Sequence, residues 1–292
     1  MNMKILLLGG SGFIGRNIIE LLGEKYDITA PTHRELDLLN ADAVQSFLNK
    51  KRYDRVIYAV NVGGKRNQKA LTGVYDANYR MFLNVAEQGE RFGRMIFLGS
   101  GAEYGKQRDI VMIKEEDFGT IQPLDDYGRS KYSISEYINE HENIINLRCF
   151  AVFGKYEDYK VRFISNAICR ALFGLPITMH RNVKFDYLYI LDLVKIIEYF
   201  IVNQPMLIFY NVGFGKPIEL TELAQIVKQA TLNDARIEIE QLGYSNEYTC
   251  DTSQLKAEIG DMALTSYEQA ISEMIEYYKN ILPIMQYKDL EE

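Results

Sequence analysis

The feature that most constrains the fold is a glycine-rich turn near the start of the chain. An apolar run at Lys4–Leu8 predicts a strand, and it is followed by Gly-Gly-Ser-Gly-Phe-Ile-Gly at 9–15 and by helical periodicity up to Leu22. Such glycines let the backbone turn sharply and approach a pyrophosphate, whose charge the first N–H groups of the helix can hold. The turn predicts a dinucleotide site, against the alternative of a glycine-rich turn without a ligand. The residues expected in this site are Gly9, Gly12, Phe13, Ile14 and Gly15.

Short apolar runs alternate with helical periodicity through the first half of the chain. The expected strands are 4–8, 27–31, 55–60, 95–98 and 144–147, and the expected helices are 13–22, 41–50, 75–91 and 128–141. Strands that alternate with helices indicate a parallel sheet covered on both faces. The expected fold class is therefore α/β, a doubly wound Rossmann-type sheet that binds ligands at the carboxyl ends of its strands.

The alternation of expected strands and helices becomes less regular after residue 154, which predicts a second, smaller part of the structure. Helices are expected at 162–173, 192–202, 220–230 and 266–278, with a strand near 207–212. There is no internal repeat and no low-complexity linker, so this part is expected to pack on the first as a lobe. We expect a dinucleotide-binding domain over 1–160 with a returning segment near 186–213, and a substrate-binding lobe built from 161–185 and 214–292.

Composition excludes several classes of function. The net charge of -7 argues against a nucleic-acid partner, although a local cationic pocket for a small anion remains compatible with it. The three cysteines are widely spaced and the three histidines lack metal-ligand spacing, so we expect buried thiols and no His/Cys metal site, with a carboxylate-only site left open. The longest apolar stretch, 188–202, carries three charged residues and is a poor membrane span. We expect a cytoplasmic protein without a membrane partner.

The residues after the second expected strand bear on the choice of dinucleotide. An Asp or Glu normally binds the ribose hydroxyls of NAD there, but the sequence reads Ala30-Pro31-Thr32-His33-Arg34. The guanidinium of Arg34 would suit a 2′-phosphate, because it can bind that group bidentately. The adjacent Glu35 weakens this inference, and a solvated loop arginine is the alternative. The pattern favours NADP, with NAD possible.

A tyrosine and a lysine four residues apart predict acid-base chemistry. Tyr127 and Lys131 stand at the start of an expected helix, so both side chains lie on one face. A nearby ammonium favours the phenolate and should lower the pKa of Tyr127 toward working pH. Ser100 follows the strand at 95–98 and could hydrogen-bond the oxygen that Tyr127 protonates, although alone it would be interpreted as a turn former. A second pair, Tyr156 and Lys160, lies in a charged loop and is interpreted as coincidental.

Taken together, the glycine turn, the strand-end serine and the Tyr-x-x-x-Lys pair resemble the extended short-chain dehydrogenase/reductase family. That family includes nucleotide-sugar epimerases, dehydratases and 4-keto reductases, and the resemblance covers nearly the whole chain. The segments 34–39 and 98–100 are most similar to the GDP-L-fucose synthase branch of 4-keto reductases, whose members use NADPH. Further family-like positions are Asn78, Asp186-Tyr187-Leu188-Tyr189 and Tyr210-Asn211-Val212-Gly213.

The resemblance implies hydride transfer between NADP(H) and C4 of a nucleotide-diphosphate sugar, and it favours a 4-keto reductase. A 4-epimerase is the alternative, a dehydratase ranks third, and a silent dinucleotide-sensing regulator is the alternative from another class. The implied catalytic residues are Ser100, Tyr127 and Lys131, with Lys131 also holding the nicotinamide ribose. Further implied cofactor residues are Arg34, Asp37, Leu38, Tyr58, Ala59 and Asn78. Many relatives form homodimers through two helices, so a homodimer is expected.

The chain also departs from the family pattern in the substrate lobe. The branch has a cysteine two residues beyond the serine and a histidine in the lobe, where this chain has Ala102 and Arg162. Double epimerisation is therefore not expected. A family arginine is replaced by Phe185, and the nearest cationic substitutes are Arg170 and Lys184, either of which could equally be a surface charge. The residues expected to bind substrate are Gly101, Ala102, Arg170 and Lys184.

Overall fold

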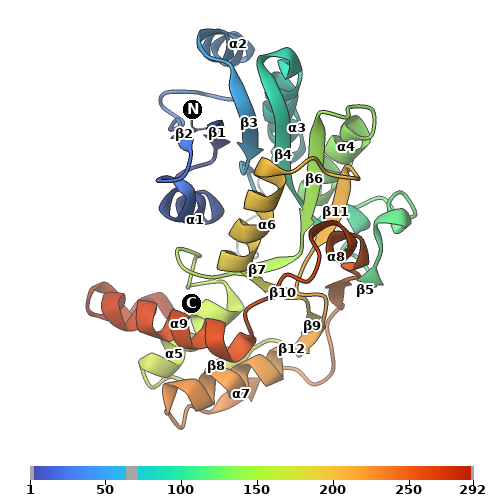
Figure 1. The fold of residues 1–292 in the computed structure, drawn as a ribbon. Coiled ribbons are helices and arrows are strands. Elements are labelled where there is room, and N and C mark those ends of the chain that lie inside the picture. Colours follow the sequence, from blue (N-terminus) through green and yellow to red (C-terminus); the bar gives the residue numbers. More distant parts are fainter. Residues whose placement is uncertain (1–2, 64–71, 291–292) are drawn as a thin grey trace.

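A six-stranded parallel sheet organises the molecule (Figure 1). The computed structural model describes residues 3–63 and 72–290. The sheet order is β11-β6-β4-β3-β1-β2, and every neighbouring pair is parallel. The strands are β1 (Lys4–Leu8), β2 (Asp27–Thr29), β3 (Tyr53–Tyr58), β4 (Phe92–Ser100), β6 (Ile144–Cys149) and β11 (Phe209–Val212).

Both faces of the sheet are buried, because successive side chains of each strand point to opposite faces. In β1, Ile5 and Leu7 belong to one core and Leu6 and Leu8 to the other. The first core contains α1 (Phe13–Leu22) and α6 (Ile190–Val202). The second contains α2 (Ala41–Lys50), α3 (Val74–Ala86) and α4 (Asp126–Ile138). The predicted doubly wound Rossmann-type fold is confirmed.

The strand order creates a crevice beside the glycine turn. β1 lies between β2 and β3, so the chain leaves β1 toward one edge of the sheet and later returns to build the other side. Loops that diverge at such a switch point leave a space outside the carboxyl ends of the strands. The turn after β1 opens into this space, which is where a ligand of the sheet is expected.

The lower part of the molecule contains three packed helices and several short strands (Figure 1). The helices are α5 (Phe163–Leu172), α7 (Leu220–Thr231) and α9 (Tyr267–Ile281), and α8 (Ser253–Ile259) lies nearer to β11. β8 (Ile177–Met179) pairs with β13 (Ile237–Ile239), and β7 (Ala151–Phe153) pairs with β10 (Tyr187–Tyr189). Short 3-10 helices occur at Gly89–Arg91, Gly101–Tyr104, Glu115–Asp117, Leu282–Ile284 and Tyr287–Leu290.

A four-stranded sheet joins segments that are far apart in the chain. Its order is β12 (Ile218–Glu219), β9 (Lys184–Phe185), β14 (Tyr248–Cys250) and β5 (Ile110–Ile113). β5 belongs to the first part of the chain, whereas the other three belong to the expected lobe or its border. The expected division into 1–160 with 186–213, and 161–185 with 214–292, remains a prediction. This sheet crosses the expected division and connects the two parts.

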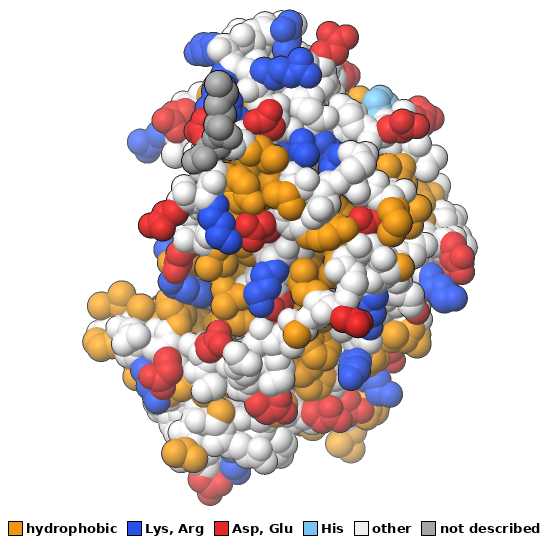
Figure 2. Space-filling view, viewed as in Figure 1, with side chains coloured by type: hydrophobic (Ala, Val, Ile, Leu, Met, Phe, Trp, Pro, Cys, Tyr) orange, Lys and Arg blue, Asp and Glu red, His pale blue; other side chains and the backbone are white. Residues whose placement is uncertain are grey.

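Hydrophobic side chains gather in patches across the middle of the molecular face shown in Figure 2, between its upper and lower parts. Charged side chains of both signs are interspersed among them. Within residues 3–63 and 72–290, no helix is both long enough and apolar enough to cross a bilayer.

Candidate active site

A cavity of about 1560 Å³ extends from the glycine turn to the lower part of the molecule. Its lining includes Gly9 and Gly12 of the glycine turn, Ser100 and Tyr127, and Thr178 of β8. A pocket for one small ligand measures roughly 300–1,000 Å³. The cavity therefore has room for two ligands.

The glycine turn fits a pyrophosphate. Gly9 has φ of +91°, and a Cβ there would lie 2.6 Å from the Ala59 carbonyl oxygen. A Cβ on Gly15 would lie only 2.1 Å from the Gly9 oxygen, so the helix could not approach the turn as closely. No side chain caps α1 at Gly12, which leaves the N–H groups of its first turn available for phosphate oxygens. Gly9, Gly12, Phe13, Ile14 and Ala59 all line the cavity.

Seven of the expected cofactor residues do not border this cavity: Gly15, Arg34, Asp37, Leu38, Tyr58, Asn78 and Lys131. Arg34 is exposed in the loop after β2, and the side chain of Asp37 accepts a hydrogen bond from the Leu39 N–H at 3.0 Å. Leu38 is buried in the core. The Tyr58 ring also lies in the core, so that only the backbone of this residue is near the end of β3. The position of Arg34 does not decide between NADP and NAD.

Asn78 supports the loop after β3 instead of facing the cavity. Its side-chain oxygen accepts a hydrogen bond from the Val62 N–H at 2.7 Å, and its amide donates to the Val62 carbonyl at 2.9 Å. The same amide lies 3.4 Å from the Ser130 hydroxyl on α4. Asn78 thus connects the rim of the cavity to the helix that carries Tyr127 and Lys131.

The predicted catalytic trio meets where β4 ends and α4 begins. Ser100 is the last residue of β4, and the Asp125 carboxylate starts α4 by accepting a hydrogen bond from the Gly128 N–H at 2.9 Å. Lys131 Nζ donates to the Leu98 carbonyl at 2.9 Å and lies 5.9 Å from the centre of the Tyr127 ring. Ser100 lowers the pKa of Tyr127, so the two side chains are neighbours. The three side chains are therefore close enough to act on one substrate oxygen.

Burial controls the proton affinities at this site. It raises the pKa of Tyr127 to about 12, although the hydrogen bond to Ser100 and the charge of Arg162 act in the opposite direction. Burial also lowers the pKa of Lys131 to about 8, because an ammonium that is 2% exposed loses its hydration. The expectation that Lys131 would bring the pKa of Tyr127 down toward neutrality is not met, since burial outweighs the neighbouring charges. Tyr127 is thus a protonated acid in this structure.

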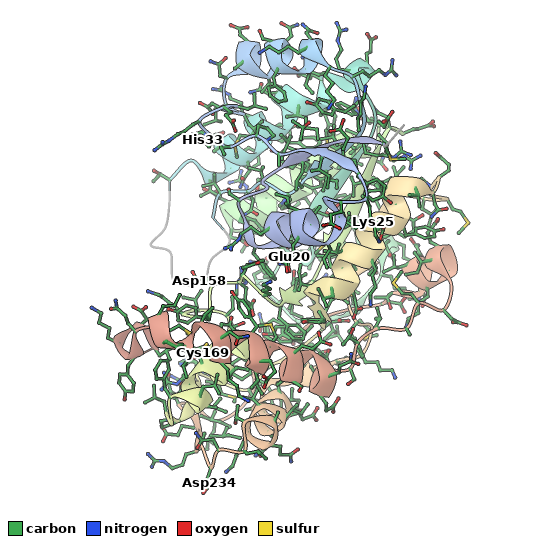
Figure 3. The ribbon with its side chains drawn as sticks, turned by 60° about the vertical axis from the view of Figure 1, so that its left-hand side comes forward. Glu20, Lys25, His33, Asp158, Cys169 and Asp234 are labelled. Carbon is green, nitrogen blue, oxygen red and sulfur yellow. The ribbon has the colours of Figure 1, made fainter. Side chains whose placement is uncertain are left out.

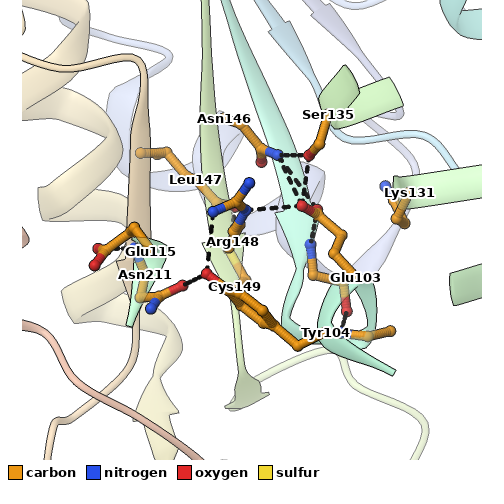
Figure 4. A network of polar contacts seen from close by, with 12 residues as sticks. Glu103, Tyr104, Glu115, Lys131, Ser135, Asn146, Leu147, Arg148, Cys149 and Asn211 are labelled. Atoms are coloured by element: carbon orange, nitrogen blue, oxygen red, sulfur yellow. Dashed lines mark hydrogen bonds and ion pairs between the residues drawn. The ribbon is translucent and has the colours of Figure 1, made fainter. Parts of the chain in front are cut away.

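A buried ionic network lies behind the trio (Figure 4). The Glu103 carboxylate accepts hydrogen bonds from the Ser100 N–H at 3.0 Å, from Ser135 at 2.5 Å and from Arg148 Nε at 2.8 Å. Both charged side chains are almost fully buried, so each compensates for the lost hydration of the other. Arg148 also donates to the Tyr104 hydroxyl at 3.0 Å. The network holds the backbone at the end of β4, and with it Ser100, in one position.

Comparison with known proteins identifies the family. The sequence profile described as "NAD dependent epimerase/dehydratase family" matches residues 5–213. The chain belongs to the NAD dependent epimerase/dehydratase family. The resemblance to nucleotide-sugar enzymes of the extended short-chain dehydrogenase/reductase type is confirmed. A nicotinamide dinucleotide is thus the expected cofactor class for this family member, and the glycine turn fits it.

Three similar proteins are distant in sequence but are aligned over nearly the whole chain. The chain is 24% identical to GDP-L-colitose synthase of Yersinia pseudotuberculosis over 95% of this chain and 98% of that protein. It is 26% identical to GDP-6-deoxy-D-talose 4-dehydrogenase of Aggregatibacter actinomycetemcomitans, covering 96% and 98% of the two chains. The solved GDP-mannoheptose C4 reductase of Campylobacter jejuni, with NADP bound, shares the fold with a TM-score of 0.81 at 18% identity, over 95% and 98%.

Of the four residues expected to bind substrate, only Arg170 lines the cavity. Its guanidinium donates to the carbonyl oxygens of Pro176 and Leu290. Lys184 lies on β9 outside the cavity lining. Gly101 and Ala102 are buried beneath the cavity floor. Cationic side chains that do line the cavity and were not predicted as substrate ligands are Lys106, Arg108, Lys160, Arg162 and Arg181.

The second Tyr and Lys pair serves the structure of the loop after β7. The Tyr156 hydroxyl donates to Glu20 at 2.7 Å, and Arg16 lies 3.7 Å above the Tyr156 ring. Lys160 forms an ion pair with Asp289 at 2.9 Å. In Figure 3, Glu20 on α1 lies above the loop that contains Asp158. These contacts attach the loop to α1 and to the C-terminal segment, and they do not join the two residues in one site.

Two residues near Ser100 were missed by the sequence analysis. Tyr248 on β14 places its hydroxyl 3.5 Å from Ser100 Oγ, and Glu103 contacts the Ser100 backbone. Nothing in the local sequence of Tyr248 indicates this position, because β14 reaches the site only through long-range pairing. Within the described part of the chain, no group of three or more His, Cys, Asp or Glu side chains is arranged to hold a metal ion.

Proposed function

We propose that this protein is an NADP(H)-dependent oxidoreductase that reduces the C4 ketone of a nucleotide-diphosphate sugar. The observation that carries the proposal is the meeting of Ser100, Tyr127 and Lys131 where β4 ends and α4 begins, with Ser100 and Tyr127 lining a cavity that also reaches the glycine turn. Two relatives aligned over nearly the full chain are named for GDP-linked sugars, and one of them is a 4-dehydrogenase. These names support a nucleotide sugar as the substrate class.

The chain's own residues account for the proton and for binding. When bound, the dinucleotide supplies a hydride. The first turn of α1 would hold the pyrophosphate, and Lys131, whose ammonium donates to the Leu98 carbonyl, would hold the nicotinamide ribose. Ser100 donates a hydrogen bond to the ketone oxygen, and Tyr127 donates the proton that this oxygen needs. A pKa of about 12 keeps Tyr127 protonated at neutral pH, which suits an acid in ketone reduction.

The preference for NADP over NAD belongs to this proposal. No carboxylate stands at the end of β2, and Arg34 is exposed in the following loop, where it can move to meet a 2′-phosphate. Arg34→Ala should weaken NADPH binding by about 10-fold, since it removes a hydrogen-bonded charge pair, and should leave NADH binding nearly unchanged. Fluorescence titration of both nucleotides measures the ratio, and equal losses for the two would contradict the preference.

A homodimer in the cytoplasm completes the proposal. α3 and α4 pack side by side, and their half-buried Tyr79 and Tyr137 lie at the edge of the second core. A second copy could cover these rings, as the family resemblance implies. Light scattering should give twice the mass of the chain, and a monomer at micromolar concentration would remove this part of the proposal.

The test of the reaction uses purified protein, NADPH and a panel of 4-keto-6-deoxy sugars linked to GDP, UDP or dTDP. Stoichiometric loss of nicotinamide absorbance supports the reductase. Interconversion of the sugar without net loss of nicotinamide absorbance would instead indicate a 4-epimerase. No reaction with any sugar would favour the remaining alternative, a catalytically silent dinucleotide-sensing regulator.

Tyr127→Phe tests the assignment of the acid. It should bind NADPH as tightly as the wild type and lose at least about 100-fold in turnover, because positioned acids contribute that much or more. Tyr26→Phe is the matched control, since it removes a hydroxyl that bonds only to Glu198 at 3.1 Å, outside the cavity. Full turnover by Tyr127→Phe would refute the assignment.

A further inference from the structure

Tyr248 is held firmly beside the catalytic serine by a part of the chain that contributes nothing else to the trio. Its ring packs on Phe150, with ring centres 4.7 Å apart, and edge-on against Phe185 at 6.0 Å. Its backbone carbonyl accepts a hydrogen bond from the Asp186 N–H at 3.1 Å. The ring therefore has little freedom, and its hydroxyl position is set by the four-stranded sheet.

Gly101 allows the Tyr248 hydroxyl to reach the serine. A Cβ on Gly101 would lie 2.6 Å from the Tyr248 hydroxyl oxygen and 2.7 Å from the Phe150 ring. The hydroxyl lies 3.5 Å from Ser100 Oγ, a long hydrogen bond of the kind that tightens when substrate closes a site. Tyr248 also lines the cavity, so its hydroxyl stands at the border between serine and substrate.

The hydrogen-bonding capacity of Ser100 Oγ limits how its neighbours can be arranged. A serine hydroxyl has two lone pairs and one proton. One lone pair accepts the Ala102 N–H at 3.2 Å. Tyr127 and Tyr248 are the two phenols next to the same oxygen. If Tyr248 donates to the second lone pair, the serine proton is left for Tyr127 or for a substrate oxygen.

We propose that Tyr248 is a positioning residue for the reduction proposed above: its hydroxyl donates to Ser100 Oγ and thereby directs the serine proton toward Tyr127 and the substrate oxygen. Tyr248 keeps its own proton throughout, so no bond is made or broken at this residue. The inference rests on the proposed function, because the direction of the serine proton matters only where a ketone oxygen is to be polarised.

The surroundings of the two phenols assign the donor. Tyr248 is flanked by the Phe150 and Phe185 rings, and burial raises its pKa well above the ordinary value of 10. Tyr127 has cations nearby: Lys106 Nζ lies 5.5 Å and Lys131 Nζ 5.9 Å from its ring centre, and Arg162 lowers its pKa. The phenolate is therefore favoured at Tyr127 rather than at Tyr248. The other titratable groups that act on one or both phenols are Glu103, Cys149 and Cys250.

A double-mutant cycle tests whether Tyr248 acts through Ser100 or independently of it. Tyr248→Phe keeps the ring and removes only the hydroxyl, Ser100→Ala removes the acceptor, and Tyr26→Phe is the matched control. With NADPH and whichever 4-keto sugar of the panel the wild type reduces, Tyr248→Phe should lower kcat by about 10-fold, the effect of one hydrogen bond, with KM nearly unchanged. On the Ser100→Ala background, Tyr248→Phe should cause no further loss.

The pH dependence is the readout that a merely structural role would not move. On the alkaline side Lys131, with a pKa of about 8, loses its charge first, and kcat/KM falls again at higher pH as Tyr127 ionises, because reduction needs Tyr127 protonated. Without the Tyr248 hydroxyl, Ser100 is a weaker donor to the Tyr127 oxygen, the phenolate is less stabilised, and the pKa of Tyr127 rises. The second of these falls in Tyr248→Phe should therefore move to higher pH, by roughly half a unit or more.

Each other result counts against the proposal. Losses that multiply in the double variant would mean that Tyr248 acts independently of Ser100. A raised KM with unchanged kcat would make it a direct substrate contact, and kinetics like those of Tyr26→Phe would leave it without a role. Failure of the wild type to reduce any sugar of the panel removes the proposed function itself, and the positioning role with it.

Discussion

Replacing the buried carboxylate of Glu157 should make the protein more stable at alkaline pH. Glu157 lies in the loop between β7 and α5, is 6% exposed, and accepts a hydrogen bond from the Ser165 hydroxyl. Burial raises its pKa from 4.5 to about 7, although Ser165 and the charge of Arg162 act in the opposite direction. Glu157→Gln retains the shape and an acceptor for Ser165, and it removes the charge that burial disfavours.

The magnitude follows from the two pKa values. Between pH 4.5 and about 7 the folded protein keeps the Glu157 proton and the unfolded chain loses it, so the free energy of unfolding falls as pH rises through this window. Below the window the carboxyl is neutral in both states and the loss is absent. Above it the loss is complete at about 3 kcal/mol, since one pH unit corresponds to about 1.4 kcal/mol. For a chain of this size that equals about 5 °C in Tm.

Thermal unfolding of the wild type and of Glu157→Gln at about pH 4.5 and about pH 8 measures this change in stability. Glu157→Gln should match the wild type at the lower pH and have a Tm higher by about 5 °C at the higher pH. Glu116→Gln is a matched control, because it removes the same charge from a side chain that is 73% exposed. The reasoning would be refuted if Glu157→Gln and the wild type differed in Tm by the same amount at both pH values. It would also be refuted if the wild type had a higher Tm than Glu157→Gln at pH 8.

Two further substitutions test the turn and the ionic network. Gly15→Ala should weaken NADPH binding by more than about 10-fold in fluorescence titration, because its Cβ would lie 2.1 Å from the Gly9 oxygen. Gly12→Ala should weaken binding less, because its Cβ would lie 3.3 Å from the same oxygen. Equal losses of NADPH affinity in the two variants would contradict this prediction. Arg148→Met should destabilise the protein by about 3–5 kcal/mol in urea unfolding, since Glu103 is left charged and buried. Adding Glu103→Gln to this variant should recover part of the lost stability. No recovery would argue against the broken ion pair as the cause of the loss.

Local patterns explain why the first half of the fold was predictable. The expected strand at 4–8 and helices at 13–22 and 41–50 have the observed bounds, because each has its own apolar period and its own start signal. The helix expected at 75–91 ends earlier, at Ala86, where the chain turns through a short 3-10 helix into β4. The proximity of Ser100 and Tyr127 could be predicted because Ser100 ends a strand and Tyr127 starts a helix, and both signals are local.

The substrate side was not predictable in the same way. β5, β9 and β14 have two to four residues each and gain their hydrogen bonds from distant segments, so no window of sequence contains their signal. Tyr248 reaches Ser100 only through this sheet. One signal was available and unused: Arg148 lies within an otherwise uncharged strand, where a buried guanidinium requires a carboxylate such as Glu103.

The pairing of β5 with β14 also sets an order of events during synthesis. Met112 on β5 donates to Thr249 on β14 across 137 positions of chain. All six strands of the central sheet end by residue 212, so they are synthesised before β14. Domains generally assemble as units as the nascent chain lengthens. A growing chain thus contains the whole central sheet and the glycine turn before it contains β14, the strand that brings Tyr248 to Ser100.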